Sequence, residues 1–377
     1  MVLKSLIFHL LLIIVPDFYL YWRYFRARAW WQQLLWFFPS FCLAVAAIWL
    51  TSLGDFVPDN MIWLNLYLLF FALVAGGKLS FSLGTFCGKR GKQIGFFLVL
   101  LEWALVFWGA FVGVRQLEVR HLDIAFNDLP AAFDGYRIVH FTDLHLGSSD
   151  KDYVCEIVDS INAQHPDVVV FTGDIQNKQP SEIQPYRGIL SGIKALDGVF
   201  SVQGNHDYAM YIDAPYYQKA MNEELTVGAQ QDMGWTVLAN YHQFVYRGGD
   251  SIVIAGMEND GNGRFPHRGN INNALWGVSR SQFVVMLEHD PVSWRNKILT
   301  HSHCQLTLSG HTHGMQFSLF GWCPLSLLKT ECNGLYHMGE RMLFVSKGAG
   351  ALVPFRFGCN PEVVVITLRK KQSSAVK

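Results

Sequence analysis

The chain has 377 residues, more than one ordinary domain needs, and its formal net charge at pH 7 is zero. It carries neither a long basic block nor an acidic tail, so we expect no nucleic-acid partner. Hydrophobic residues make up 51% and charged residues 16% of the chain, a composition that favours a membrane protein. The apolar excess lies near the start, which predicts a transmembrane region at residues 1–115 and a second domain at residues 116–377.

Four apolar stretches predict helices that span a membrane, and they cover roughly residues 3–21, 31–53, 61–81 and 94–114. Each is close in length to the about 20 helical residues that cross the hydrocarbon core of a bilayer. Pro16 and Asp17 interrupt the first stretch, which leaves a signal peptide that starts with Lys4 as an alternative. No small-residue cleavage site follows this stretch, so we favour a spanning helix.

Basic residues occupy two of the three connections between these stretches: Arg23, Arg26 and Arg28 in the first, and Lys89, Arg90 and Lys92 in the third. The second connection, TSLGDFVPDN, has no Lys or Arg. Because cytoplasmic loops carry an excess of Lys and Arg, the two basic connections are predicted to be cytoplasmic. We therefore expect a multi-pass protein of the inner (cytoplasmic) membrane whose second domain lies on the extracytoplasmic side.

Glu102 lies inside the fourth apolar stretch. A carboxylate at this depth is costly and can mark an ion or proton pathway. The alternative is a protonated or hydrogen-bonded acid that faces a neighbouring helix. We favour the second interpretation, because the sequence places no other charged group well inside the remaining stretches.

The second domain shows strands that alternate with helices. Buried strands are predicted at residues 136–141, 168–171 and 199–202, with amphipathic helices at 152–163 and 186–196. Five further strand patterns follow with less helix between them, which predicts a second sheet packed on the first. The predicted fold class is therefore α/β, as a four-layer αββα sandwich of two mixed sheets flanked by helices, preceded by a four-helix transmembrane region.

Polar side chains able to bind a metal follow the predicted strands: Asp143, His145, Asp174, Asn205, His206, His289, His311 and His313. Ligands in open α/β sheets gather outside the carboxyl ends of the strands. Carboxylate, imidazole and amide donors without a thiolate suit divalent manganese, iron or zinc. Asp143 and His145 are two residues apart, as are His311 and His313. In extended backbone this spacing predicts that both side chains of a pair point to one side.

One ion needs three or four protein ligands, so this set predicts two ions that share a carboxylate. Asp174 is the candidate for the shared ligand, because it lies on a Gly-Asp turn between the other loops. A hydroxide held between two such ions can attack phosphorus in line. The sequence therefore predicts cleavage of a phosphate ester or pyrophosphate bond; a purely structural metal site is the alternative.

The motifs DLH, GD, GNHD, EHDP and GHTHG, in this order, resemble those of the calcineurin-like metallophosphoesterase family. The similarity runs over about residues 117–369, and the four preceding stretches resemble its membrane-bound bacterial branch. The resemblance implies one ion on Asp143, His145, Asp174 and His313, and a second on Asp174, Asn205, His289 and His311. It also implies that His206 protonates the leaving oxygen, with Asp207 as a candidate to orient that ring. Met315 replaces the second glycine of the family pattern GHTHGG.

Several features leave alternatives open. Cys323 and Cys332 either form a disulfide in an oxidising compartment or remain free thiols. The apolar segment at residues 317–328 either contacts lipid, which would suit a lipid-linked substrate, or is a buried loop. His301 and His303 match no motif position and are predicted to be polar residues before a strand.

Two functions from different classes are compatible with these patterns. The first is a membrane-anchored phosphoesterase that acts on a phosphorylated small molecule or lipid at the bilayer. The alternative is a membrane sensor or transporter whose phosphoesterase-like domain binds ligands without catalysis. We favour the enzyme, because none of the expected metal ligands or the proton donor is missing from the sequence. The sequence does not define the oligomeric state.

Overall fold

The computed structural model describes residues 2–53, 60–328 and 330–371. The chain divides into two compact units. The helical unit comprises Met1–Val112, Tyr211–Asp213 and Val353–Phe355. The two-sheet unit comprises Gly113–Met210, Ala214–Leu352 and Arg356–Lys377.

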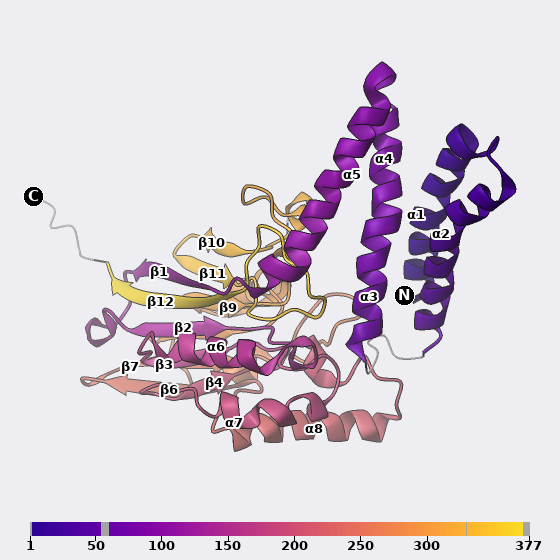
Figure 1. Ribbon diagram of the computed structural model, residues 1–377. Helices are drawn as coiled ribbons and strands as arrows, with labels where there is room; N and C mark the ends of the chain where they lie inside the picture. Colours follow the sequence, from indigo (N-terminus) through magenta and orange to yellow (C-terminus); the bar gives the residue numbers. More distant parts are fainter. Residues whose placement is uncertain (1, 54–59, 329, 372–377) are drawn as a thin grey trace, which may run out of the picture. The chain divides into compact units, whose positions relative to one another are not determined.

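The helical unit consists of helices whose surfaces are largely apolar. In chain order these are α1 (Val2–Leu20), η1 (Tyr21–Phe25), α2 (Trp30–Thr51), α3 (Met61–Phe71), η2 (Ala72–Gly76), α4 (Gly77–Thr85), α5 (Gly91–Phe107) and η4 (Trp108–Val112) (Figure 1). They form four segments long and apolar enough to cross a membrane: Leu6–Phe25, Trp30–Thr51, Met61–Thr85 and Gly88–Arg115. The four predicted spans are confirmed. The basic connections, α1 to α2 and α4 to α5, lie at the same end of this unit, its upper end in Figure 1.

Helices α4 and α5 approach closely because glycine faces glycine at their contact. A Cβ atom added to Gly84 would lie 2.3 Å from the Cα atom of Gly95, which no side chain tolerates. Small residues of this kind let the backbones of membrane helices pack tightly. Glu102 of α5 lies against Gly76, where an added Cβ atom would meet its Oε1 atom at 2.9 Å.

A buried ion pair lies within the membrane-spanning helices. Lys78 Nζ in α4 is 2.5 Å from Asp17 Oδ1 in α1, and both side chains are almost fully buried. The expectation that no charged group other than Glu102 lies well inside the spans is therefore wrong. Asp17 interrupts an apolar run and Lys78 lies near the end of another, so neither reveals its depth from sequence alone.

Two six-stranded mixed sheets form the centre of the two-sheet unit. The first has the order β1 (Glu118–Phe126), β12 (Glu362–Lys370), β2 (Arg137–Phe141), β3 (Val168–Phe171), β4 (Val199–Ser201), β5 (Thr236–Val237). The second has the order β10 (Gly334–Met338), β11 (Arg341–Val345), β9 (Leu306–Ser309), β8 (Phe283–Leu287), β7 (Asp250–Gly256), β6 (Tyr241–Arg247). Most neighbours are parallel, and antiparallel pairs include β12 with β2 and β6 with β7.

Alternation along the strands divides the apolar residues between two layers. In β2, Ile138 joins the core between the sheets, whereas the next residue, Val139, packs against the helices outside the first sheet. That outer face is covered by α6 (Lys151–Asn162), α7 (Arg187–Leu190) and α8 (Tyr216–Asp232). The outer face of the second sheet is covered by α9 (Ile271–Ala274) and η11 (Trp294–Ile298). The predicted four-layer αββα architecture is confirmed.

Candidate metal centre

Five strands end in the loops that contain the residues singled out from the sequence. β2, β3 and β4 are neighbours in the first sheet, and β8 and β9 are neighbours in the second. Because these strands are mutually parallel within each sheet, their carboxyl ends lie at one edge. The loops contain Asp143, His145, Asp174, Asn205, His206, His289, His311 and His313.

The predicted ligands converge in space. Three groups have ligand atoms that all lie within 4.8 Å of one another: Asp143, His145 and His313; His145, Asp174 and His206; Asp174, His289 and His311. Asn205 joins the third group, because its Oδ1 atom is 3.2 Å from His289 Nε2. The structure therefore brings every predicted ligand, and His206 with them, into one centre.

One oxygen of Asp174 lies between the two sides of this centre. Its Oδ2 atom is 3.2 Å from His289 Nε2 and 3.8 Å from His145 Nε2. The other oxygen, Oδ1, accepts a hydrogen bond of 2.8 Å from the backbone N–H of His206. This backbone contact fixes the carboxylate, and leaves Oδ2 directed at imidazoles from both sides.

Backbone strain is concentrated in these loops. Asp143, His145, Asp174, His311 and His313 all have left-handed backbone, with φ between 46° and 70°. The prediction of extended backbone at the two i, i+2 pairs is therefore wrong, since both members of each pair have left-handed backbone. Residues other than glycine pay about 1–3 kcal/mol for such conformations, which occur mainly at functional sites.

Hydrogen bonds fix the orientation of three imidazole rings. His289 Nδ1 donates to the Thr172 carbonyl at 2.7 Å, and His206 Nδ1 donates to the Asn177 carbonyl at 2.5 Å. His145 Nδ1 donates to the side-chain oxygen of the same Asn177 at 3.2 Å. Because Nδ1 carries the proton in His145 and His206, these neutral rings keep their Nε2 lone pairs for a ligand. This is the arrangement found around metal-binding histidines.

Burial decides the charges of these groups. It lowers the pKa of His145 to about 3, so this ring is neutral at pH 7, and it raises the pKa of Asp143 to about 6. Burial also opposes ionisation of Asp174, but the positive charge of His289, followed by the smaller effect of His206, holds the pKa of this carboxyl well below the usual range. Burial disfavours charge on His289 too, yet the Asp174 carboxylate raises the pKa of that imidazole to about 10.

This donor set fits divalent metal ions. Neutral imidazoles, carboxylates and an amide oxygen are ligands for manganese, iron and zinc. The Nε2 atoms of His145 and His313 lie 3.1 Å apart in a buried space, and a cation bound by both imidazoles would take the place of the proton between them. Two groups of ligands that share Asp174 suit two ions better than one.

Sequence reasoning missed the residues that hold the loops together. The Asp207 carboxylate accepts hydrogen bonds from the backbone N–H groups of Asp174, Ile175 and Gly204 at 2.8–3.1 Å. It therefore joins the loops after β3 and β4, and the idea that it orients the His206 ring is wrong. Its place in GNHD marked Asp207 in the sequence but not this role, whereas nothing in the sequence marks Asn177.

Arg356 supports the loop of Gly348 and Gly350, which contacts Asp143. Its guanidinium is fully buried and donates to the carbonyls of Gly348 and Gly350 at 3.2 and 2.5 Å. Gly350 N–H in turn donates to the Asp143 carbonyl at 2.8 Å. The only sequence signal for this role is an arginine in an otherwise apolar segment.

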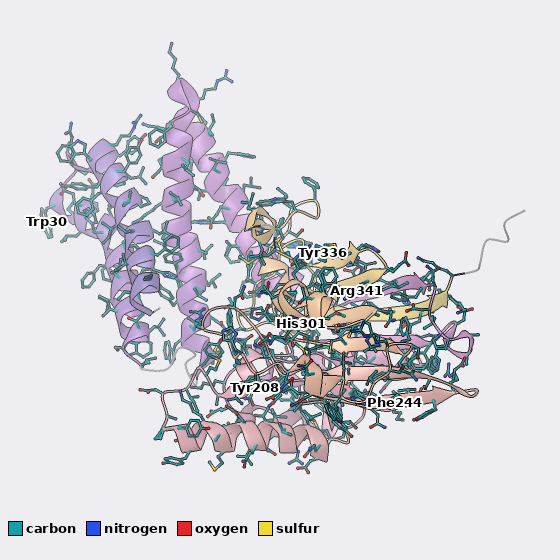
Figure 2. The ribbon with its side chains drawn as sticks, turned by 180° about the vertical axis from the view of Figure 1, so that it is seen from behind. Trp30, Tyr208, Phe244, His301, Tyr336 and Arg341 are labelled. Carbon is teal, nitrogen blue, oxygen red and sulfur yellow. A yellow bond between two sulfur atoms is a disulfide. The ribbon has the colours of Figure 1, made fainter. Side chains whose placement is uncertain are left out.

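The remaining candidates lie outside the centre. His301 and His303 belong to none of the three ligand groups found among the described residues. His301, labelled in Figure 2, is exposed, and its Nδ1 atom lies 3.1 Å from the Lys297 carbonyl. Cys323 and Cys332 form a disulfide.

The segment after His313 exposes apolar side chains. Phe320 is fully exposed, and Leu319 and Trp322 are nearly half exposed. The alternative of a buried loop is therefore wrong for these three residues. The disulfide at Cys323 fixes the end of this stretch to the segment at Cys332.

Comparison with known proteins identifies the family. The family described as calcineurin-like phosphoesterase matches residues 136–315. An uncharacterized metallophosphoesterase of Bacillus subtilis (strain 168) is 30% identical, over 74% of this chain and 97% of the relative. An uncharacterized metallophosphoesterase of Helicobacter pylori (strain J99) is also 30% identical, over 76% of this chain and 72% of the relative.

A relative with membrane spans is similar as well. A transmembrane protein with metallophosphoesterase domain from Danio rerio is 28% identical, over 72% of this chain and 62% of the relative. The matched family region contains the loops after β2, β3, β4, β8 and β9, which form the centre described above. The chain therefore belongs to the calcineurin-like metallophosphoesterase family, as an enzyme with four N-terminal helices able to cross a membrane.

Proposed function

We propose that this metallophosphoesterase hydrolyses a phosphate ester or pyrophosphate bond at a centre of two divalent ions, on a substrate in or near a membrane. The observation that carries the proposal is the position of Asp174 Oδ2, which faces His289 on one side and His145 on the other. A shared carboxylate is what a pair of ions about 3.5–4 Å apart requires.

The ligands are assigned as two sets. One ion would be held by Asp143, His145, Asp174 and His313, and the other by Asp174, Asn205, His289 and His311. Manganese, iron and zinc are the ions that suit these donors. When bound, such ions would neutralise charge on the phosphate and lower the pKa of a water molecule to about 7.

His206 is proposed as the proton donor to the leaving oxygen. Its ring is buried, its Nδ1 donates to the Asn177 carbonyl, and it lies within reach of His145 and Asp174. Burial lowers the pKa of this imidazole, which opposes its protonation. An anionic phosphate beside the ring would favour the charged form, so the substrate itself would help to supply the proton that cleavage consumes.

The exposed apolar stretch that follows His313 in the sequence supports a substrate at the bilayer surface. Phe320 and Trp322 follow His313 by only a few residues and present large apolar surfaces to solvent. Exposed clusters of this kind often mark contacts with lipid or protein. We therefore propose a lipid-linked phosphate ester or pyrophosphate as the natural class of substrate.

We further propose that the two-sheet unit lies on the extracytoplasmic side of the inner membrane. Two observations support this side: the basic residues of both connections at one end of the helical unit, and the Cys323–Cys332 disulfide, which suits an oxidising compartment. A phosphatase reporter fused after Lys377 should be active outside the cytoplasm. Activity of a cytoplasm-only reporter at this position would overturn the orientation.

The test of the enzyme centre combines activity with metal analysis. The purified full-length protein, loaded with manganese, should hydrolyse an aryl phosphate or an aryl phosphodiester. Replacement of a residue that only hydrogen-bonds to a metal ligand reduces activity by about 10- to 100-fold. Because Asp174 is proposed to bind both ions directly, Asp174→Asn should reduce hydrolysis by more than this. Asp159→Asn, at an exposed position of α6, is the matched control and should retain two ions per chain. Full activity of Asp174→Asn would refute the proposal.

A further inference from the structure

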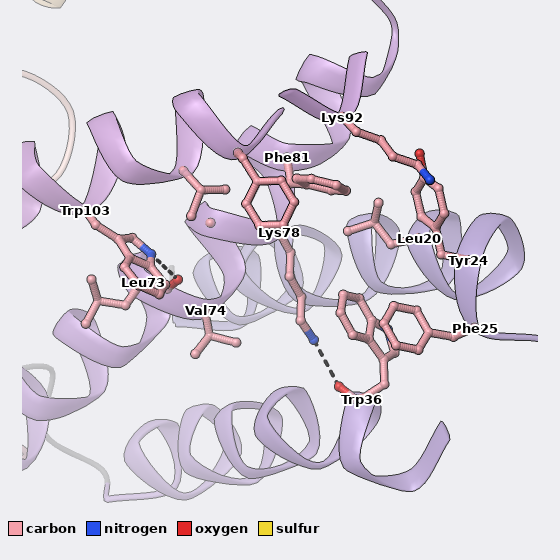
Figure 3. Close-up of a pocket in the computed structure, with 13 residues that line it drawn as sticks. Leu20, Tyr24, Phe25, Trp36, Leu73, Val74, Lys78, Phe81, Lys92 and Trp103 are labelled. Carbon is pink, nitrogen blue, oxygen red and sulfur yellow. Dashed lines mark hydrogen bonds between the residues drawn. The ribbon is translucent and has the colours of Figure 1, made fainter. Parts of the chain in front are cut away.

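A cavity of about 480 Å³ lies within the helical unit (Figure 3). Its size falls in the range of about 300–1,000 Å³ that is usual for small-molecule sites. The wall is almost entirely apolar and aromatic, and includes Trp36, Leu73, Phe81 and Phe96. Phe96 remains 65% exposed, so the cavity is open beside α5, where lipid would lie. No residue of the metal centre lines this cavity.

The cavity has one cationic end and one apolar end. Figure 3 shows Lys92 and Tyr24 at one side, and Trp103 and Leu73 at the other. Lys92 and Trp103 lie on the same helix, and at 1.5 Å per residue they are about 16 Å apart along its axis. This length of the cavity along α5 is about half of the roughly 30 Å hydrocarbon core. The cavity is therefore about as long as one leaflet of a bilayer is thick.

The two lysines in the wall have different roles. Lys78 Nζ already contacts Asp17 Oδ1 at 2.5 Å, Ser40 Oγ at 2.8 Å and the Trp36 carbonyl at 3.2 Å. These contacts use its three donors. Lys92 lies over the Tyr24 ring at 5.1 Å, and among the described residues no carboxylate pairs with it.

The surroundings of Lys92 are uniformly positive. Lys89 and Arg90 precede it in the same connection. Arg23 of η1 lies 5.8 Å from the Tyr24 ring, the same ring that Lys92 contacts. The sequence has no Asp or Glu at residues 18–54 or 60–101. An anion at this end therefore finds several cations and no competing carboxylate, and basic pockets between membrane helices bind anionic lipid headgroups.

We propose that this cavity is a binding site for an anionic phospholipid, separate from the metal centre. One acyl chain lies along Leu73, Phe81 and Phe96, and the phosphate contacts Lys92 at the basic end. The aliphatic and aromatic wall recognises the chain, and the uncompensated lysine selects the negative headgroup. The Lys78–Asp17 pair holds α1, α2 and α4 around the cavity and contributes no free charge to the ligand.

The test uses native mass spectrometry of the detergent-solubilised full-length protein. Phosphatidylglycerol and phosphatidylcholine with identical acyl chains are added together. The wild-type protein should retain phosphatidylglycerol about fivefold better, the factor expected for one lysine near an anionic headgroup. Lys92→Gln should abolish this preference. Lys89→Gln, in the same connection but outside the cavity wall, should preserve it.

A second pair of variants tests the cavity itself. Val99→Trp fills the space from the wall and should remove retention of both lipids, whereas Leu100→Trp, at an exposed neighbouring position, should leave it unchanged. Val74→Trp serves the same purpose from η2, should Val99→Trp fail to fold. Aryl-phosphate hydrolysis should persist in every correctly folded variant. Equal retention of the two lipids by the wild-type protein, or unchanged retention after the cavity is filled, would overturn the proposal.

Discussion

The Nε2 atoms of His145 and His313 lie 3.1 Å apart, although 168 residues separate them in the chain. Burial lowers the pKa of His145 to about 3 and holds that of His313 well below its usual range, so both rings are neutral. The rings stack at 5.0 Å between centroids. His145 Nδ1 already donates to Asn177, so His145 Nε2 accepts a hydrogen bond from His313 Nε2. A cation bound by both rings would take the place of that shared proton.

Removal of one of these imidazoles should therefore reduce the number of bound metal ions per chain by one. We expect His313→Ala to bind one manganese ion per chain instead of two, measured by inductively coupled plasma mass spectrometry. Saturating manganese should also stabilise this variant less, because a ligand at about 100 times its Kd contributes about 2.7 kcal/mol per site. His301→Ala, at an exposed position, is the control. Two ions on His313→Ala would exclude this residue as a ligand.

Replacement of His206 should affect substrates according to their leaving group. A nitrophenolate leaves without a proton, whereas an alkoxide needs one, so His206→Asn should slow hydrolysis of an alkyl phosphate far more than that of p-nitrophenyl phosphate. The expected difference is about 10²- to 10⁴-fold, the range for general acid catalysis. His165→Asn, at an exposed site, should change neither rate.

Metal content separates this role from a further ligand role for His206, since its ring lies in one group with His145 and Asp174. The proton-donor proposal expects two ions per chain on His206→Asn. An equal loss of rate on both substrates, together with loss of metal, would show that the imidazole binds an ion instead.

Met315 has left-handed backbone with φ of 57°, at the position where the family pattern has glycine. This conformation costs a residue other than glycine about 1–2 kcal/mol, whereas glycine loses about 0.5–1 kcal/mol more through backbone entropy. Met315→Gly should therefore stabilise the protein by up to about 1 kcal/mol, a rise of about 2–4 °C in Tm. Met338→Gly in β10 starts from the same exposed fraction, 48%, and should lower Tm. A lower Tm for Met315→Gly would show that its side chain stabilises the turn.

The exposed aromatic residues after the metal centre should matter only for substrates in a lipid phase. Phe320→Ser with Trp322→Ser should reduce kcat/KM for phosphatidic acid in mixed micelles by about tenfold. That factor equals about 1.4 kcal/mol, within what burial of one or two large side chains contributes. Hydrolysis of p-nitrophenyl phosphate should stay within about twofold, since neither ring belongs to the ligand groups.

The control is Leu196→Ser. This side chain is 79% exposed and precedes β4, at the opposite edge of the sheet from the metal centre. It should leave both rates unchanged. A parallel decline on both substrates in the aromatic double variant would indicate damage to the centre instead of lost contact with lipid.

The sequence was sufficient for the architecture and for the loops that meet at the centre, because both depend on local patterns. Buried strands appear as apolar runs such as residues 168–171, and Asp174 follows directly where that run ends. Once parallel strands pair, their ends must meet. The convergence of the loops thus follows from the burial of apolar side chains on both faces of each sheet.

The backbone and the supporting contacts could not be predicted in the same way. Nothing in the local pattern shows that His145 and Asp174 have left-handed backbone, because that strain is maintained by contacts with distant loops. The three hydrogen bonds to Asp207 depend on the register between β3 and β4. The partner of Lys78 likewise depends on how α1 packs against α4, and it lies 61 residues away.

The Lys78–Asp17 pair should stabilise the helical unit as a pair and destabilise it when either partner is removed. Lys78→Met leaves a carboxylate whose side chain is 3% exposed without its cation, and Asp17→Asn leaves the ammonium without its anion. Loss of one partner of a buried ion pair costs about 3–5 kcal/mol, so both single variants should lose several degrees of thermal stability in detergent. The double variant Asp17→Asn with Lys78→Met should recover most of the loss, because no buried charge remains. Lys89→Met, at an exposed position, should match the wild-type protein. If the single variants were as stable as Lys89→Met, the pair would contribute nothing to the packing of these helices.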